Sequence, residues 1–299
     1  MVEQYKTNPQ YKRLVGEKAI GVFPGEDGNI DRETIQSFGD EWLEFDEFSD
    51  EDIRVAGDEY FDIVPESVYA GKYVLDVGCG TGRWSKYLSG KVSALEAVDP
   101  SEAVLSAAAL LQNNDNVRIS QASAGDIPFS NNTFDFVLSL GVLHHIPDTQ
   151  AAMQKCIDKL KPGGHFLVYL YYSLDNRGFF FKTLFHLSNF MRNIISSFPF
   201  RLKKMVCDLL AFSLYLPFIA VARLLQSVGF MECAKRVPLS YYVGKSLYII
   251  RNDSLDRFGT PLEKRFSRER IQHMMTGCGL SNIVFSENKP FWHALGRKG

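Results

Sequence analysis

The sequence predicts an α/β protein with a seven-stranded, mostly parallel sheet and helices on both faces of that sheet. Three observations support this fold class. Short apolar runs alternate with helix-compatible segments from residue 73 to residue 172, and a glycine-rich turn follows the first run. The run 165–171 is almost continuously apolar, as expected of a central strand.

Five apolar runs in this region are expected to form parallel strands, and two later runs to form an antiparallel pair. Between them, a helix should begin after a serine cap at Ser267 and end at Gly279. The parallel strands are expected at 73–77, 92–98, 117–121, 134–140 and 165–171, and the closing pair at 283–286 and 292–295.

The chain is expected to have four parts. An acidic, helical N-terminal segment covers 1–72, the sheet-forming core covers 73–172, a large helical insertion covers 173–265, and the closing helix and strands cover 266–299. Residues 1–72 hold 7 Lys and Arg against 18 Asp and Glu, a net charge of −11, whereas residues 174–258 hold 12 against 5, a net charge of +7. The two segments could complement one another or contact partners.

The insertion is rich in apolar and aromatic residues. One helix is expected around Phe180 and Phe185, and a second from Leu202 to Val228, with Pro217 expected to kink or split it. Between Met205 and Val221 there is a single charged residue, but a membrane span needs about 20 apolar residues. We therefore expect no transmembrane span, and prefer a helix pair that roofs a pocket; an amphipathic element on a membrane surface is the alternative. The residues that oppose a span are an acid and a proline within the apolar stretch and three basic residues beside it: Asp208, Pro217, Arg201, Lys203 and Lys204.

Composition narrows the function classes. A hydrophobic content of 45% and a charged content of 23% are ordinary for a soluble protein, and a net charge of −2 argues against nucleic-acid binding. The five cysteines are scattered without metal-ligand spacing, so we expect no metal site and a reduced, cytoplasmic protein. The first eight residues lack an apolar signal core.

The turn at residues 74–82, Val-Leu-Asp-Val-Gly-Cys-Gly-Thr-Gly, is the strongest functional signal. Its glycines, including Gly78 and Gly80, let the backbone approach a ligand at the start of a helix. Asp99 follows Gly78 by 21 residues, where an acid can accept hydrogen bonds from ribose hydroxyls. The sixth fingerprint position is Arg83 rather than glycine, which weakens the case for NAD. Asp76 could instead hold an ammonium group, which NAD lacks.

Together with residues 96–101, Glu-Ala-Val-Asp-Pro-Ser, this turn resembles the nucleotide-binding half of class I S-adenosylmethionine (SAM)-dependent methyltransferases. Residues 73–172 are most similar to the quinone-biosynthesis type of small-molecule methyltransferase. The resemblance implies a Rossmann-like sheet, SAM as cofactor and S-adenosylhomocysteine as product. The alternative is a generic turn in another Rossmann-like protein.

The resemblance also implies a set of cofactor-binding residues. Ser123 would stand where the family commonly has an Asp that binds the adenine amine, and the Ala124 amide would face the ring; a slip of one to three residues would bring in Asp126. Trp42, in the N-terminal segment, could cover the methionine end, or could be a packing anchor. The complete predicted set is Asp76, Gly78, Gly80, Asp99, Pro100, Ser123, Ala124, Leu140 and Trp42.

Methyl transfer needs alignment of the methyl acceptor, methyl group and sulfur, and a general base if the acceptor is a hydroxyl or an acidic carbon. His145 and His144, in the loop after the fourth strand, are the candidate bases; their alternative role is to pack the loop. Tyr172, Tyr241 and Tyr242 are expected to line the acceptor pocket, or else to belong to a core.

The leading hypothesis is a SAM-dependent methyltransferase for a small or lipid-like acceptor, apolar or ring-bearing, with O- or C-methylation favoured. One alternative is a protein of the same fold with other chemistry, and another is a SAM-binding, non-catalytic partner protein. The sequence leaves a homodimer open.

Overall fold

A computed structural model of the chain describes residues 4–25, 28–44, 48–174 and 178–299. The chain divides into two compact units. The core unit comprises Met1–Arg177 and Leu262–Gly299, and the helical unit comprises Gly178–Pro261. The N-terminal segment and the C-terminal residues therefore belong to the same unit as the predicted sheet.

The core unit has a Rossmann-like fold with a mixed sheet. Strands β2, β5, β4, β3, β6 and β7 run parallel, while β1, β9 and β8 pair antiparallel with their neighbours. The sheet order is β1-β2-β5-β4-β3-β6-β7-β9-β8. The strands are β1 (Tyr11–Val15), β2 (Lys18–Val22), β3 (Tyr73–Val77), β4 (Ala94–Asp99), β5 (Val117–Gln121), β6 (Phe134–Leu140), β7 (Leu160–Tyr169), β8 (Leu280–Phe285) and β9 (Ala294–Lys298).

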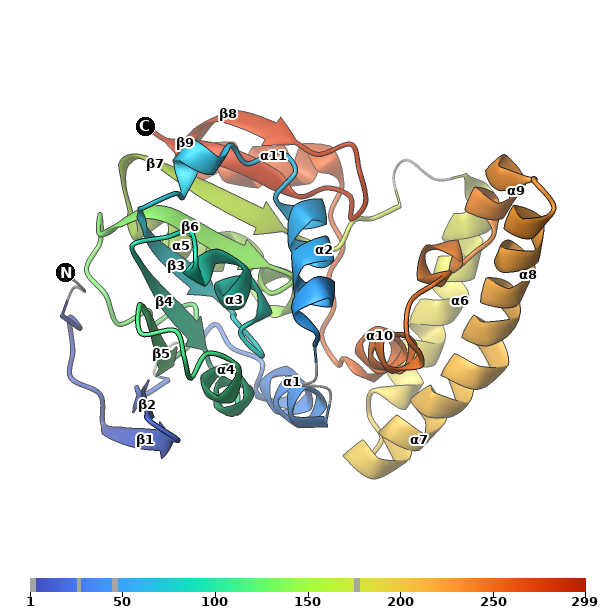
Figure 1. Ribbon diagram of the computed structural model, residues 1–299, viewed down its shortest axis with the longest axis horizontal. Coiled ribbons are helices and arrows are strands. Elements are labelled where there is room, and N and C mark those ends of the chain that lie inside the picture. Colours follow the sequence, from blue (N-terminus) through green and yellow to red (C-terminus); the bar gives the residue numbers. More distant parts are fainter. Residues whose placement is uncertain (1–3, 26–27, 45–47, 175–177) are drawn as a thin grey trace. The chain divides into compact units, whose positions relative to one another are not determined.

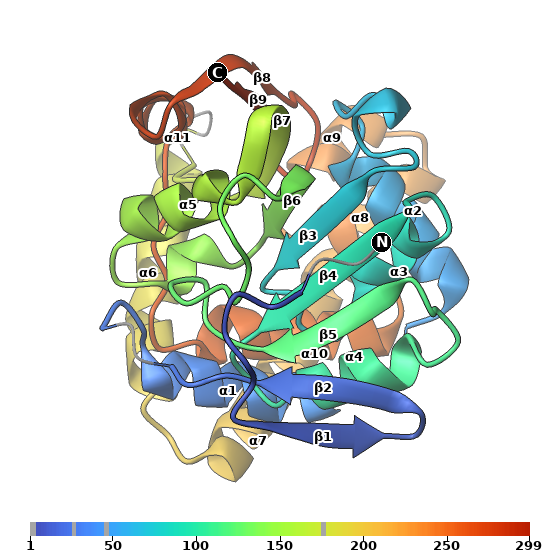
Figure 2. The same cartoon turned by 90° about the vertical axis from the view of Figure 1, so that its left-hand side faces the viewer.

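The expectation of seven strands is wrong, because the sheet of the described residues has nine. The two additional strands, β1 and β2, form a hairpin in the N-terminal segment that was expected to be helical, and β2 pairs with β5 at the sheet edge (Figure 2). A two-residue loop joins them, and its first residue, Gly16, has φ +56°. Such a glycine-containing loop favours a hairpin, which the acidic composition of the segment obscured.

Helices cover both faces of this sheet (Figure 1). Consecutive strand residues point to opposite faces, so Leu75 packs with residues of α5 and α11, whereas Val74 packs with residues of α3 and α4. The helices of the core unit are α1 (Arg32–Glu44), α2 (Asp50–Tyr60), α3 (Arg83–Ser89), α4 (Val104–Leu110), α5 (Thr149–Asp158) and α11 (Arg268–Gly277), with short 3₁₀ turns η1 (Glu66–Val68) and η2 (Leu143–His145).

The helical unit contains one long helix and several shorter ones. α7, a π-helical turn η3 and α8 are continuous over Phe200–Ser227, 28 residues. The π turn lies directly before Pro217, whose missing N–H removes a helical hydrogen bond without ending the helix. The elements are α6 (Phe179–Ile195), α7 (Phe200–Leu210), η3 (Ala211–Tyr215), α8 (Leu216–Ser227), α9 (Met231–Arg236), η4 (Ser240–Tyr242) and α10 (Leu247–Gly259).

The long helix is apolar enough and long enough to cross a membrane by length and composition alone. Its most apolar window has a mean hydropathy of 2.0, and 28% of that window is buried. A single helix of this kind is weak evidence for a span, since helices of soluble proteins pass the same test. The absence of a transmembrane span stays a prediction.

Candidate cofactor and acceptor site

The glycine turn is held tightly between neighbouring strand ends. Strand β3 is buried throughout and ends directly before Gly78, whose amide donates to the Val98 carbonyl oxygen at 2.7 Å. Gly78 has φ +78°, and a Cβ atom there would lie 2.3 Å from a methyl carbon of Val142. Any side chain would therefore be both strained and crowded, so the sequence requires glycine at this position.

Asp76 lies beneath the turn with unused hydrogen-bonding capacity. Its side chain is fully buried, and one carboxylate oxygen accepts a hydrogen bond from Ser85 Oγ at 2.7 Å. The other oxygen, Oδ1, has no hydrogen-bond partner among the described residues. Burial, assisted by the negative charge of Asp99, raises the pKa of Asp76 to about 7, although the hydrogen bond from Ser85 opposes the rise. A buried, unpartnered carboxylate oxygen fits a cationic donor from a ligand, such as the ammonium group of SAM.

Asp99, at the end of β4, organises the loop on which a ribose would lie. Its Oδ2 accepts the Gly80 amide at 3.0 Å, and its Oδ1 accepts both the amide and the hydroxyl of Ser101, at 2.8 Å and 2.6 Å. Burial raises the pKa of Asp99, although these hydrogen bonds oppose the rise. Because Oδ1 already accepts two bonds, Oδ2 has the remaining capacity for a ribose hydroxyl. Ser101 is thus a positioning residue that the sequence reasoning missed.

Trp42 reaches the glycine turn from α1. A Cβ atom on Gly80 would lie 3.8 Å from Trp42 Nε1, which is an ordinary van der Waals distance, so the indole lies directly against this part of the turn. The Arg83 guanidinium lies 5.3 Å from the centre of the Trp42 ring and 4.7 Å from that of Trp84. The structure therefore places Trp42 beside the turn; its contact with a cofactor stays a prediction.

The segment predicted to line the adenine follows β5. Ser123 and Ala124 are buried, and the Asp126 amide donates to Ser123 Oγ at 3.1 Å. The backbone of this segment is tied to β4 by a hydrogen bond from the Ala122 amide to the Asp99 carbonyl oxygen at 3.1 Å. The segment thus lies beside Asp99, and the adenine contacts stay predictions. Leu140 is buried at the end of β6, and Pro100 follows Asp99 at the end of β4; these two strands flank β3 in the sheet.

His144 and His145 share the short turn η2, but their surroundings differ. His144 is fully buried, neither ring nitrogen has a hydrogen-bond partner among the described residues, and burial lowers its pKa well below the usual value. His145 is 6% exposed, and its Nδ1 lies 2.6 Å from the Leu262 carbonyl oxygen. A carbonyl can only accept, so Nδ1 carries the proton and Nε2 of the neutral ring carries the lone pair. His145 is the better placed of the two to act as a base.

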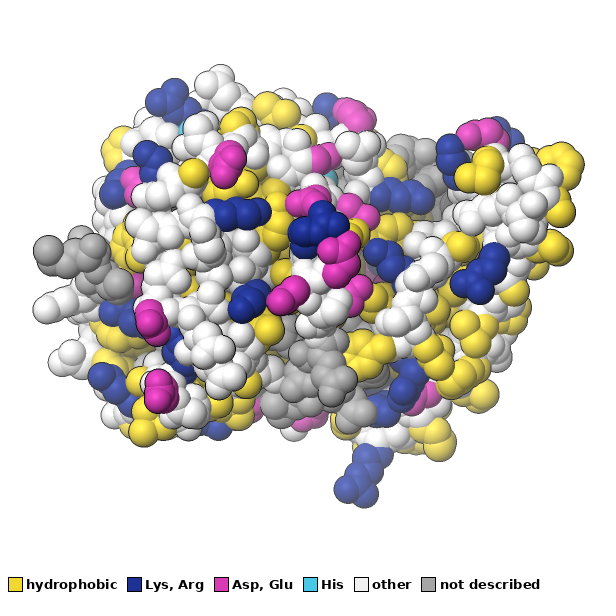
Figure 3. All heavy atoms as spheres, viewed as in Figure 1, with side chains coloured by type: hydrophobic (Ala, Val, Ile, Leu, Met, Phe, Trp, Pro, Cys, Tyr) yellow, Lys and Arg dark blue, Asp and Glu magenta, His cyan; other side chains and the backbone are white. Residues whose placement is uncertain are grey.

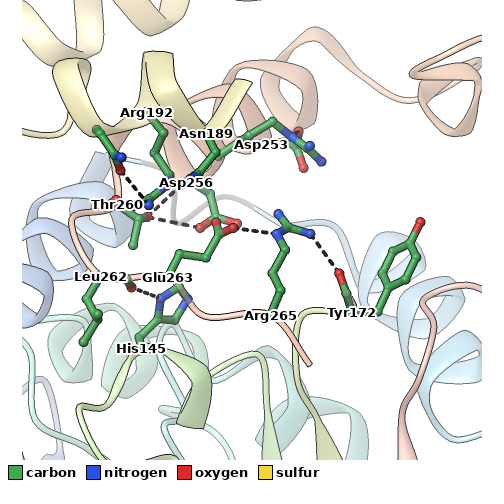
Figure 4. A network of polar contacts seen from close by, with 12 residues as sticks. His145, Tyr172, Asn189, Arg192, Asp253, Asp256, Thr260, Leu262, Glu263 and Arg265 are labelled. Atoms are coloured by element: carbon green, nitrogen blue, oxygen red, sulfur yellow. Dashed lines mark hydrogen bonds and ion pairs between the residues drawn. The ribbon is translucent and has the colours of Figure 1, made fainter. Parts of the chain in front are cut away.

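Residues 262–266 cross the histidine turn as a strap that the sequence reasoning missed (Figure 4). The Lys264 amide donates to the His144 carbonyl oxygen at 3.1 Å, and the Phe266 amide donates to the Tyr171 carbonyl oxygen at 2.8 Å. Arg265 pairs with buried Glu263 at 2.8 Å and lies 5.2 Å from the Tyr171 ring centre. About ninety residues separate this strap from β7, so no local signal in the sequence links the two.

The three tyrosines predicted for the acceptor pocket belong to different units. Tyr172 lies three residues after Tyr169, the last residue of β7, and its carbonyl oxygen lies 3.4 Å from Arg265 (Figure 4). Tyr241 and Tyr242 form part of η4 in the helical unit. There the Tyr242 hydroxyl bonds to Asp253, and Tyr241 is 41% exposed. Their expected role in the pocket stays a prediction.

Among the described residues, no group of three or more His, Cys, Asp or Glu could hold a metal ion. The site therefore consists of a glycine turn, two buried carboxylates and a histidine turn, all within the core unit.

A methyltransferase domain family matches residues 75–168. Over 114 residues the chain is 36% identical to the ubiquinone biosynthesis O-methyltransferase of Azotobacter vinelandii, an alignment that covers 36% of this chain and 46% of that protein. It is 34% identical to the protein of the same name from Pseudomonas fluorescens, with the same coverage. The chain thus matches less than half the length of these curated relatives. A crystal structure of a putative methyltransferase from Bacillus halodurans aligns with 78% of this chain and 72% of its own, at 14% identity and a TM-score of 0.47.

The family match identifies residues 75–168 as a methyltransferase domain. This match and the curated relatives support a class I SAM-dependent methyltransferase domain, and S-adenosyl-L-methionine is the cofactor that such a domain implies.

Proposed function

We propose that the protein is an enzyme that transfers the methyl group of SAM to a small, apolar or ring-bearing acceptor, by O- or C-methylation. The observation that carries this proposal is the unpartnered, fully buried Oδ1 of Asp76 beside a turn in which Gly78 leaves no room for a side chain. The names of the relatives, ubiquinone biosynthesis O-methyltransferases, support a small-molecule acceptor and O-methylation.

The cofactor-binding residues have separate tasks in this proposal. Asp76 would receive the ammonium group of the methionine moiety, Asp99 Oδ2 would receive a ribose hydroxyl, and Trp42 would exclude water above the glycine turn. SAM, when bound, supplies an activated methyl group on a sulfonium. The protein then has mainly to align the methyl acceptor and keep the site dry.

His145 is the proposed general base for a hydroxyl acceptor. The hydrogen bond from its Nδ1 to Leu262 fixes the ring orientation and presents Nε2 as the proton acceptor. His144 packs at 3.9 Å between ring centres against both His145 and Tyr171, which suits a supporting role beneath it. Tyr172 is proposed to orient the acceptor from the end of the β7 region.

Cofactor binding can be tested by calorimetry with SAM and S-adenosylhomocysteine. Asp99→Ala removes a charged hydrogen-bond acceptor, which costs about 2–3 kcal/mol, so affinity should fall about 30- to 150-fold. Asp115→Ala, at an exposed acid outside the site, is the matched control and should bind like the wild type. Unchanged affinity in a folded Asp99→Ala protein would remove Asp99 from the cofactor site.

Turnover is tested separately, by incubating the protein with methyl-labelled SAM and a panel of phenols, catechols and quinols. Label transferred to one class of acceptor supports the proposal. A protein that binds SAM tightly and transfers no label to any acceptor in the panel, including lipid-tailed ones, would instead support the non-catalytic alternative. Conversion of an acceptor without labelling would support other chemistry on the same fold.

A further inference from the structure

Large hydrophobic side chains are exposed very unevenly between the two units. Of the 17 large exposed hydrophobic side chains in the described residues, 14 belong to the helical unit. The other three are Tyr11, Leu14 and Val284. The helical unit is less than a third of the chain, so the difference is a property of that unit and not of the protein's general composition.

The exposed residues form stripes along helices. On the long helix they recur mostly every three or four residues, the spacing of residues on one helical face. Figure 3 shows hydrophobic side chains on the surface of the helical unit. A second, shorter stripe runs along α6. The residues of the long stripe are Leu202, Met205, Leu209, Phe212, Val221, Leu224 and Val228, and those of the short one are Leu187, Phe190 and Ile194.

The opposite face of the long helix is buried and carries small apolar residues together with hydrogen-bonded polar groups. Asp208 accepts hydrogen bonds from Arg251 on α10 at 2.8 Å and 2.9 Å. Further along, Asp253 accepts from the Tyr215 hydroxyl at 2.7 Å and from Tyr242. The Ser254 hydroxyl donates to the Cys207 carbonyl oxygen at 2.7 Å.

A second polar network joins α6 to the end of α10 (Figure 4). Arg192 donates to the carbonyl oxygens of Thr260 and Pro261, both at 2.8 Å. The helical unit thus has an interior of apolar residues such as Ile250, Leu255 and Phe258, crossed by these polar networks, and a second set of large apolar side chains on its surface. A surface of this kind is not expected in water, but it is expected where a helix contacts lipid.

Positive charge accompanies the apolar face. Residues 178–261 hold 11 Lys and Arg against 4 Asp and Glu, a net charge of +7. Arg201 and Arg223 are exposed next to the long stripe. An apolar groove of about 600 Å³ adjoins Arg223, and Lys245 is a second cation in its lining. Its apolar lining includes Leu216, Ile219, Leu224 and Ile250.

We propose that the helical unit attaches the protein to the surface of a bilayer that contains anionic lipids. The stripes enter the boundary of the acyl chains, Arg201 and Arg223 contact headgroup phosphates, and the groove seats one lipid chain with its headgroup at Lys245. The net charge of the helical unit favours an anionic lipid surface over a second copy of the chain as the partner of the apolar stripes. Two units of +7 would repel one another, whereas an anionic surface neutralises both the charge and the apolar area.

Vesicle flotation of the full-length protein tests this attachment. We compare vesicles of phosphatidylcholine with vesicles that also contain phosphatidylglycerol, and expect binding to the second kind that weakens as salt is raised. Leu209→Gln, Phe212→Ser and Leu224→Gln, combined in one variant, should weaken binding by about tenfold or more, because apolar area on the stripe drives insertion. The matched control is Tyr11→Ser with Leu14→Gln in the core unit, which should bind normally.

A second variant isolates the electrostatic contribution. Arg201→Gln with Arg223→Gln should remove most of the preference for phosphatidylglycerol, and Lys12→Gln in the core unit should not. The substituted side chains are exposed, so circular dichroism should show unchanged helix content in every variant. SAM calorimetry on the same proteins should also be unchanged, which separates failure of this proposal from failure of the proposed function.

Four outcomes would overturn the proposal. The first is wild-type protein that binds neither kind of vesicle. The second is equal binding by the wild type and the stripe variant. The third is bound protein that resists extraction by alkaline carbonate, which would mean a spanning helix. The fourth is a stripe variant that loses self-association instead of vesicle binding, which would mean a dimer face.

Discussion

The core unit and the helical unit differ in where their large hydrophobic side chains lie. In the core unit, strand residues such as Leu138 are fully buried, and the buried carboxylates of Asp76 and Asp99 lie at the candidate site. In the helical unit, Leu209 is 65% exposed although Phe258 is buried, and Asp208 and Asp253 lie within hydrogen-bonded networks. Hydrophobicity therefore predicts burial well in the core unit, whereas in the helical unit many large apolar side chains lie on the surface.

The largest expected effect is on stability, from a matched pair of leucines. Leu138→Ala should lower the free energy of unfolding of the core unit by about 2–5 kcal/mol, since it leaves a cavity in a closed core. Leu209→Ala should cost about 0.5 kcal/mol or less, because the side chain is exposed. Denaturant titration measures both. Equal losses would mean that Leu209 is buried in solution, and the contrast between the units would fail.

The next effect is on catalysis and concerns the histidine turn. His145→Asn should lower turnover by about 100-fold while leaving SAM affinity near that of the wild type, because only the proton acceptor is lost. Tyr241→Trp, in the helical unit, should change kcat/KM between acceptors if the predicted pocket role is correct, and should otherwise leave it unchanged. Normal turnover in folded His145→Asn protein would reduce His145 to a packing residue.

A smaller stability effect is expected in the helical unit, from a polar side chain instead of an apolar one. Asp253→Ala removes the acceptor of the Tyr215 and Tyr242 hydroxyls and should destabilise the helical unit by about 2 kcal/mol. Glu232→Ala is the control, because its ion pair with Lys235 is exposed to solvent and should contribute little to stability. If thermal unfolding showed no difference between these two variants, the interior networks would contribute nothing measurable.

The smallest effect is a pH dependence of cofactor affinity. Burial raises the pKa of Asp76 to about 7, so the carboxyl is largely protonated at pH 6 and largely ionised at pH 8. An ammonium ligand needs the ionised form, so SAM affinity should rise with pH by up to about tenfold between these values. Asp76→Asn should abolish the rise. Affinity that falls with pH would place the ammonium group elsewhere.

The sequence predicted the core unit well because there the pattern and the burial agree. The runs at 73–77 and 134–140 became strands at those positions, and the glycine turn lies where its spacing placed it. The hairpin was missed because its apolar runs are short and lie in an acidic segment. The strap at 262–266 was missed because contacts across a long insertion leave no trace in local periodicity.

The helical unit was harder to predict for a different reason. Two helices were expected there, corresponding to α6 and the long helix, whereas α9 and α10 were not expected. An apolar helical pattern also has the same form whether the apolar face points inward or outward. The decision depends on what the polar face contacts, as at Asp208 and Arg251. A sequence alone could not pair residues that are 43 positions apart.

The hydrogen bonds between the strap and the residues just after β7 affect which insertions the chain can accept during evolution. The Phe266 amide bonds to the Tyr171 carbonyl oxygen, and the Ser173 amide bonds to the Phe266 carbonyl oxygen, so the chain leaves and re-enters the core unit at one clamp. The entropy of closing such an excursion grows only slowly with its length. Residues between the two arms of the clamp can therefore be lengthened, shortened or exchanged during evolution while the methyltransferase domain keeps its own fold. The clamp therefore makes this position one where additional segments can be inserted into the methyltransferase domain.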